Sequence, residues 1–137
     1  MDRRTFLAAS GTAALTALAG CGSASGGLSD SDYDIAMYSN RFEPRELTVS
    51  VGDTVVWGNT GSRSHSVTAY EGEIPDDASY FASGGFDSED AALEGWPSKG
   101  GVDPGETYEH TFSVAGTYGY YCIPHEAANM VGTIVVE

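Results

Sequence analysis

The chain has 137 residues, with 20 Asp and Glu against 6 Lys and Arg, which gives a formal net charge of −14 at pH 7. This acidic balance disfavours binding to nucleic acids, whose phosphates attract basic proteins. The length suffices for one domain with a single core, and no internal repeat is visible.

The N-terminal residues 1–20 have the features of an export signal rather than of a folded segment. Arg3 and Arg4 precede an apolar, alanine-rich stretch, which resembles a twin-arginine signal peptide. That stretch is too short for a stable transmembrane helix. The small residues directly before Cys21 have the form of a lipoprotein cleavage site, so we expect lipidation of Cys21. The protein is therefore expected to be lipid-anchored at the outer face of the cytoplasmic membrane, exported by the twin-arginine route.

Residues 21–33 are rich in Gly and Ser and are expected to form a flexible tether. From Cys21 onward, four cationic residues stand against nineteen acidic ones, a formal charge of −15. We interpret this acidity as an adaptation to high salt, because the Debye length falls to about 3 Å at 1 M salt and self-repulsion is then screened. An acidic docking patch for a basic partner is the alternative.

Short segments of alternating apolar and polar residues follow in the predicted domain, residues 34–137. Leu47–Val51 and Val55–Trp57 alternate on either side of Gly52-Asp53, which predicts a hairpin. Strands are expected at residues 34–38, 45–51, 54–59, 65–70, 107–112, 117–122 and 132–137. This pattern indicates an all-β, Greek-key β-sandwich of about seven to eight strands. The one helical feature expected is a short turn near Asp76–Phe81.

A thiol, an imidazole and a thioether lie within nine residues near the C-terminus, at Cys122, His125 and Met130. A cysteine sulfur and two histidine nitrogens can form a trigonal plane around copper, with a methionine sulfur as a weak axial ligand. Pro124 restricts the turn between the first two groups, and strand-like segments on both sides anchor the loop. With His65 as the second imidazole, the sequence predicts a site for one copper ion that cycles between Cu(I) and Cu(II).

The segment from Gly116 to His125, followed by Met130-Val-Gly, resembles the plastocyanin group of the cupredoxins. Upstream, residues 42–57 resemble the first strands of that family, and residues 59–67 resemble the segment that carries its first histidine ligand. With the acidic composition and the leader, the closest resemblance is to the halocyanins, membrane-attached blue copper proteins of salt-loving archaea. The resemblance covers residues 34–137.

Two features depart from the plastocyanin pattern. Ser66 follows the first histidine, where plastocyanins usually carry an Asn that hydrogen-bonds toward the cysteine loop. Residues 76–103 are longer and richer in glycine than in the plant proteins, so no site residue is taken from this stretch.

The resemblance implies a mobile one-electron carrier, not an enzyme, that exchanges electrons with membrane-bound donor and acceptor complexes and is expected to be a monomer. Its electron exit is expected at His125, framed by the apolar residues Pro124, Ala127, Ala128 and Met130. In the family, a tyrosine directly before the copper cysteine offers a more remote electron path, and Tyr121 holds that position. An ordinary core or edge aromatic remains the alternative for Tyr121.

Three other functions are disfavoured. A copper oxidase or nitrite reductase needs further copper centres, and the chain has only the histidines His65, His110 and His125. A copper storage or delivery protein usually presents clusters of Met or His, which its three methionines do not form. Zinc could use the same Cys and His groups, but an axial methionine favours copper. A disulfide between Cys21 and Cys122 would consume the thiolate that copper needs.

The remaining histidine and the aromatic residues receive structural assignments. His110 is expected to be a partly buried strand histidine, and Trp57 is expected in the core. If the strand before the cysteine is regular, Tyr118 and Tyr120 share the face of Cys122, while Tyr121 points to the opposite face.

Overall fold

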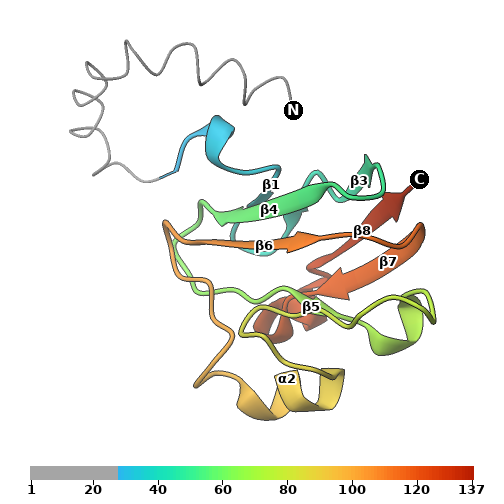
Figure 1. The fold of residues 1–137 in the computed structure, drawn as a ribbon. Helices are drawn as coiled ribbons and strands as arrows, with labels where there is room; N and C mark the ends of the chain where they lie inside the picture. Colours follow the sequence, from blue (N-terminus) through green and yellow to red (C-terminus); the bar gives the residue numbers. More distant parts are fainter. Residues whose placement is uncertain (1–27) are drawn as a thin grey trace.

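The computed structural model describes residues 28–137 and shows two four-stranded sheets packed face to face (Figure 1). The predicted export signal, Cys21 and most of the predicted tether lie outside the described residues. The two-layer arrangement confirms the predicted β-sandwich. None of the helices within residues 28–137 has the length and apolar character needed to cross a membrane.

The first sheet has the strand order β2-β1-β4-β6, and the second has the order β3-β8-β7-β5. The strands of the first sheet are β1 (Ile35–Met37), β2 (Phe42–Glu43), β4 (Thr54–Asn59) and β6 (Thr107–Thr111). Those of the second are β3 (Glu46–Val49), β5 (Thr68–Ala69), β7 (Gly116–Tyr121) and β8 (Val131–Val136). The helices are α2 (Glu89–Gly95) and the 3-10 helices η1 (Asp30–Asp32), η2 (Glu71–Glu73) and η3 (Ile123–Ala128).

The predicted hairpin across Gly52-Asp53 is wrong, because the two strands belong to different sheets. β3 pairs in parallel with β8, whereas β4 lies between β1 and β6. Gly52 has a φ of 94° and its amide donates to the Phe112 carbonyl, so the turn crosses from one sheet to the other. Alternation reports which face of a strand is buried, and it does not identify the strand beside it.

The strand expected at residues 65–70 is much shorter in the structure. Regular pairing is limited to β5, and His65 makes only an isolated bridge with Val102. The two amides of this bridge donate to the opposite carbonyls at 3.1 and 2.7 Å. His65 is therefore held by the segment that precedes β6.

The short turn expected near Asp76–Phe81 forms at its start, where the Ala78 amide donates to the Pro75 carbonyl at 3.0 Å, but it does not extend into a helix. The α-helix of this region is α2, which the sequence did not predict. Ser88 caps α2 by accepting a hydrogen bond from the Ala91 amide at 3.1 Å. Seven residues are too few for a clear helical period. In Figure 1, α2 lies outside the two sheets, on the side of β5.

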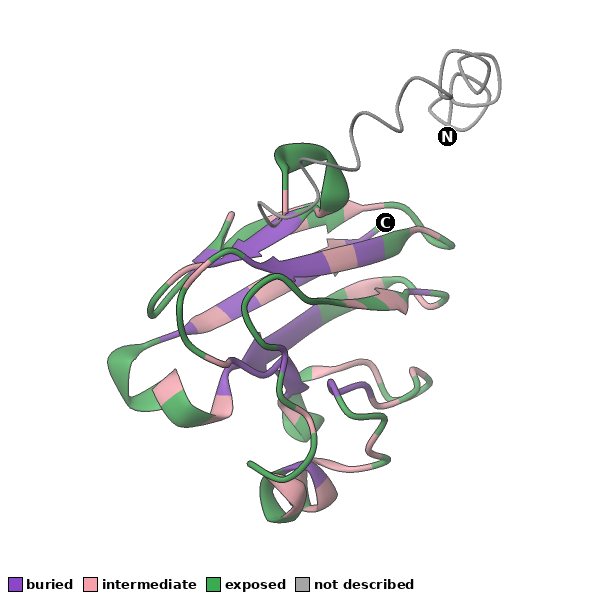
Figure 2. Ribbon diagram, turned by 90° about the vertical axis from the view of Figure 1, so that its left-hand side faces the viewer, coloured by how far each residue is buried: buried purple, intermediate pink, exposed green. Residues whose placement is uncertain are grey.

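The core lies between the sheets and is rich in aromatic side chains; buried residues are concentrated on the strands (Figure 2). Trp57 is fully buried, as predicted, and meets Tyr120 edge to face at a centroid distance of 5.4 Å. Tyr118, Tyr120 and Cys122 belong to this core, whereas Tyr121 faces the other side of β7. The predicted alternation along this strand is therefore confirmed.

Candidate metal centre

The candidate ligands come together at one end of the sandwich, where β4 and β7 finish and β6 and β8 begin (Figure 1). We call this the ligand end. His65 reaches it through the segment between β4 and β5, and the loop from Cys122 to Met130 joins β7 to β8. These two segments are far apart in the sequence, and only the packing of the two sheets brings them together.

The cysteine loop is closed by its own backbone. The Cys122 amide donates to the Met130 carbonyl at 3.1 Å, and the Met130 amide donates to the His125 carbonyl at 3.2 Å. Pro124 lies in the first turn of η3, and Asn129 ends that helix in the left-handed conformation with a φ of 70°. Asn tolerates this conformation better than most residues do. The loop therefore returns Met130 to the start of the loop and holds it beside Cys122.

Three ligand atoms face one another at short distances. The Nδ1 atoms of His65 and His125 are 3.2 Å apart, and the Cys122 Sγ lies 3.5 and 3.4 Å from them. His65, Cys122 and Met130 are fully buried, while His125 is only half-buried. The fold thus brings two nitrogens and one sulfur together at a buried point, and among these ligands only His125 reaches solvent.

Ser66 takes part in this arrangement on two sides. Its backbone amide donates to the Cys122 Sγ at 3.4 Å, and its hydroxyl accepts a hydrogen bond from the Ile123 amide at 2.9 Å. The hydroxyl also lies 3.0 Å from the Thr68 hydroxyl. Ser66 therefore ties the His65 segment directly to the cysteine loop, by a short hydroxyl rather than an amide side chain.

Asn59 is a supporting residue that the sequence did not predict. It is buried at the end of β4, and its side-chain amide donates to the carbonyls of Arg63 and Val102, both at 2.7 Å. Its side-chain oxygen accepts from the Gly61 amide at 2.9 Å. The only sequence signal was an Asn between a strand and a Thr-Gly turn, a common pattern that does not reveal such distant partners.

Burial controls the protonation of all three groups. It lowers the pKa of His65 to about 4, helped by repulsion from a charged His125, and it also lowers the pKa of His125. Both imidazoles are therefore neutral at pH 7 and can act as ligands. Burial raises the pKa of Cys122 to about 11, partly offset by the Ser66 amide, so a bound cation must displace the thiol proton.

The surface around the half-buried His125 is formed by small apolar residues. Pro124, Ala127 and Ala128 are exposed, as predicted for a surface that frames this imidazole. Met130 is fully buried and is not part of that surface, which corrects the expectation for this residue.

Tyr121 is covered by other side chains. It is buried, its ring stacks on Tyr70 at a centroid distance of 4.3 Å, and its hydroxyl donates to a Glu89 carboxylate oxygen at 2.9 Å. Glu89 begins α2, so the long segment of residues 76–103, here called the insertion, lies over this tyrosine. His110 stacks on Phe81 at 4.7 Å away from the ligand end, in the structural role expected of it.

Comparisons with known proteins agree with this geometry. Residues 31–137 match the family of copper binding proteins described as the plastocyanin/azurin family. The chain belongs to this family. A plastocyanin of Scenedesmus fuscus is 38% identical over 96 residues, which cover 70% of this chain and 86% of that protein.

Further relatives extend the likeness to longer proteins and to solved structures. The chloroplastic plastocyanin minor isoform of Arabidopsis thaliana is 39% identical over 70% of this chain, which spans 50% of that protein. A mutant amicyanin solved with Cu(I) has 30% identity and a TM-score of 0.56, over 80% of this chain and 86% of that one.

The donor set fits the copper that this family binds. Two neutral imidazole nitrogens and a cysteine sulfur are the ligands that favour copper, and the three atoms already face a common point. The sulfur and nitrogens lie within 4.8 Å of one another. Copper is therefore the cofactor of this protein, as the sequence predicted, with His65, Cys122 and His125 converging on it and Met130 held beside them by the loop.

Proposed function

We propose that the protein is a mobile one-electron carrier with a mononuclear blue copper centre, in which Met130 supplies the axial sulfur. The observation that carries this proposal is the rigid frame around the ligands. Hydrogen bonds from Ser66, Asn59 and the loop backbone fix the ligand segments from several sides. Bound copper supplies the Cu(I)/Cu(II) couple, and a frame that does not rearrange lets the electron move with little structural change.

Each residue around the copper has its own role in the proposed electron transfer. The buried His65 and Cys122 exclude water from the centre, and the Ser66 amide supports negative charge on the cysteine sulfur. The half-buried His125 gives the only ligand edge at the surface, among small apolar residues that suit brief contact with a partner. A carrier requires rapid release, so a small contact surface of this kind is appropriate.

The proposal includes a location. The leader, the predicted lipidation of Cys21 and the acidic composition support a halocyanin-like protein, exported and lipid-anchored outside the cytoplasmic membrane. Its donor and acceptor would then be membrane-bound complexes that it meets transiently as a monomer. Copper storage or delivery is less well supported, because Met37 and Met130 are both buried and offer no exposed sulfur ligands.

Copper loading tests the proposed function directly. The purified protein with Cu(II) should show an intense absorption band at about 600 nm and a small copper hyperfine splitting in electron paramagnetic resonance. The band should disappear on reduction by ascorbate and return on oxidation. A colourless protein, or one with a large hyperfine splitting, would instead indicate copper handling without this electron-transfer centre.

A variant of the thiol ligand provides the matched control. Cys122→Ser should abolish the intense band, because the band arises from charge transfer between thiolate and copper. Ser79→Ala, at an exposed residue, should leave it unchanged. A strong blue band in the Cys122→Ser protein would mean that another sulfur binds the metal.

A further inference from the structure

The four cationic side chains of residues 28–137 are Arg41, Arg45, Arg63 and Lys99. All four belong to segments of the ligand end. Arg63 lies in the loop between β4 and His65. Lys99 lies three residues before Val102, the bridge partner of His65. Within residues 28–137, the positive charges are therefore gathered at one end.

The other two cations reach the same end from the first and third strands. The loop that contains Arg41 follows β1, and the Met37 carbonyl before it accepts a hydrogen bond from the Thr60 amide at 3.2 Å. Arg45 directly precedes β3, and its carbonyl accepts from the Thr133 amide near the start of β8 at 2.9 Å. Both loops therefore border the segments that carry the ligands.

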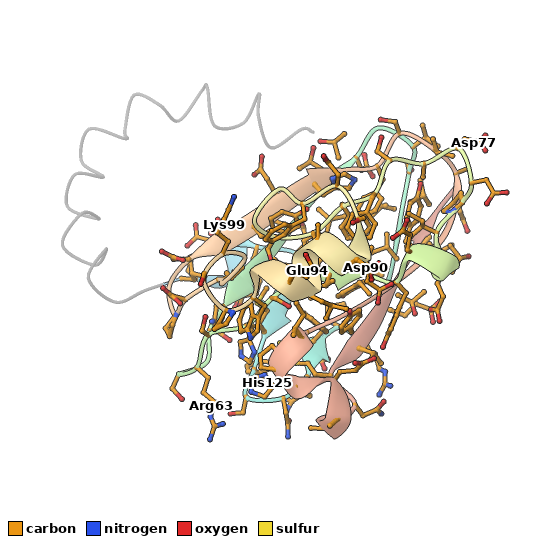
Figure 3. The ribbon with its side chains drawn as sticks, turned by 90° about the horizontal axis from the view of Figure 1, so that it is seen from below. Arg63, Asp77, Asp90, Glu94, Lys99 and His125 are labelled. Atoms are coloured by element: carbon orange, nitrogen blue, oxygen red, sulfur yellow. The ribbon has the colours of Figure 1, made fainter. Side chains whose placement is uncertain are left out.

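Arg63 is the cation most closely associated with the exposed ligand. It lies two residues before His65, in the loop between β4 and β5. Figure 3 shows Arg63 and His125 at the same end of the molecule, with Asp77 at the opposite end. Arg63 is exposed, and within residues 28–137 the one ion pair is between Arg41 and Glu43, at 3.8 Å.

Three acidic groups near the ligand end are engaged as hydrogen-bond acceptors. Glu126 accepts the Tyr70 hydroxyl at 2.7 Å, and Asp103 accepts the Ser64 hydroxyl at 2.8 Å. A Glu106 carboxylate oxygen accepts the Asp103 amide at 3.0 Å. Arg63 and Lys99, in contrast, have no carboxylate within ion-pair distance among the described residues. Their charges remain available to a binding partner.

We propose that the ligand end docks against an acidic face of a partner protein, with Arg63 contacting partner carboxylates beside His125. This proposal rests on the proposed electron-carrier function and names its partner's chemistry. The rest of the described chain has many carboxylates and no cation, so it repels an acidic partner and favours approach by the ligand end. A protein is the occupant because the group that meets His125 must give or accept an electron, which a lipid headgroup cannot do.

A redox-inert anion can map this surface on the full chain loaded with diamagnetic Cu(I). Hexacyanochromate(III), a paramagnetic trianion, should broaden backbone amide resonances around Arg63, Lys99 and His125 and spare those near Asp77. The titration should use the lowest salt at which the near-ultraviolet circular dichroism remains that of the folded protein. A hexaglutamate peptide should shift the same resonances.

Charge variants identify the role of Arg63. Arg63→Gln should reduce the broadening at the ligand end about threefold or more. In water, the attraction between a unit charge and an anion a few ångströms away strengthens binding of the anion by about that factor. Ser50→Glu makes the same change in net charge at an exposed residue beside the C-terminal end of β8. That control should reduce the broadening much less. Equal effects of the two variants would mean that only net charge matters and would overturn the proposal.

Two further outcomes separate the alternatives. Broadening spread evenly over the surface, or none, would overturn the docking surface. A stronger effect of phosphatidylglycerol vesicles than of hexaglutamate on these resonances would replace the protein partner by a lipid surface. Because the mapping involves no electron transfer, its failure leaves the proposed function intact, whereas absence of the blue band would contradict the proposed function itself, on which the choice of a protein partner depends.

Discussion

Met130 has a different structural position from the other ligand candidates, because it closes the cysteine loop as well as facing the core. Its amide and carbonyl both bond within the loop, and its side chain is fully buried. A buried methionine is often simply a packing residue, so its role must be separated from its contribution to the core. The reduction potential makes this separation, since an axial ligand acts on it directly.

We predict opposite shifts for two replacements of Met130. Met130→Gln should keep the copper and lower the potential by about 60 mV or more, the change that accompanies a tenfold shift in relative affinity. The harder amide oxygen favours Cu(II). Met130→Leu fills a similar volume without any ligand atom and should raise the potential. Protein-film voltammetry measures both, and equal potentials in all three proteins would mean that Met130 is not axial.

His110 provides a prediction on pH that is independent of the ligands. Burial lowers its pKa below the ordinary value of 6.5, so in the folded state it resists protonation. The unfolded chain takes up this proton more readily, so protonation favours unfolding. The contribution of neutral His110 to the free energy of unfolding is therefore complete above about pH 7 and is lost as the pH falls below about 6.5.

His110→Gln removes this contribution. The copper-free variant should lose less free energy of unfolding than the original protein between about pH 7 and pH 5, as measured by urea denaturation at constant high salt. Part of the loss should remain, because His65 and His125 also have lowered pKa values. An identical loss in both proteins would show that His110 titrates normally in the folded state.

At the scale of elements, the α2 insertion is attached to the second sheet by an interlocked set of carboxylates. Glu89 accepts the Tyr121 hydroxyl at 2.9 Å with one oxygen and the Glu71 amide at 2.9 Å with the other. In return, a Glu71 carboxylate oxygen accepts the Glu89 amide at 3.1 Å. The start of α2 is thereby joined to η2 and to β7, directly behind the cysteine ligand.

Tyr121→Phe tests this attachment. The variant keeps the ring that stacks on Tyr70 and loses the hydroxyl bond, which should cost about 1 kcal/mol. Hydrogen exchange should accelerate at the amides of α2, while the blue band stays unchanged. Tyr118→Phe, which loses a hydroxyl bond to the Val114 carbonyl at the other end of β7, should leave α2 unaffected. Unchanged exchange in α2 after Tyr121→Phe would mean that Glu71 and packing alone hold the helix.

The same elements explain what the sequence could and could not predict. Cys122, His125 and Met130 are close in sequence, so their spacing alone indicated the chemistry of the site. The contribution of Asn59, in contrast, depends on the Val102 carbonyl, which is remote in the chain. The partners of β3 and β4 were also missed, because strand pairing is fixed by the packing of both sheets and local alternation is the same for many pairings.

The insertion was the least predictable part for a related reason. α2 has one buried side chain, Ala92, so its seven residues carry almost no periodic signal. Its position depends on contacts made by Glu89 and on tight packing around Phe86, where Gly84 and Gly95 leave no room for a side chain. Such contacts cannot be recognised in a single sequence before the neighbouring elements are placed.

At the scale of the whole molecule, charge is distributed unevenly. Nineteen acidic residues stand against four cationic ones in residues 28–137, and the four cations lie at the ligand end. Repulsion between carboxylates is therefore concentrated in the part of residues 28–137 away from the ligand end, where acidic residues have no nearby cation. Asp76 and Asp77 are exposed neighbours in that part of the molecule. Only mobile counterions can screen this repulsion.

We predict that the copper-free protein melts at a lower temperature as salt is removed. Screening lengths of about 3 Å at 1 M salt and about 10 Å at 0.1 M allow repulsion to grow as salt falls. For a domain of this size, each kcal/mol lost lowers the melting temperature by about 4–8 °C. Circular dichroism melts at a series of potassium chloride concentrations measure the effect.

The melting temperature of the double variant Asp76→Asn, Asp77→Asn should depend less on salt, whereas that of Thr117→Gln, at an exposed residue without charge, should match the original protein. A melting temperature that does not change with salt would contradict adaptation to high salt and leave the acidity to be explained by partner binding.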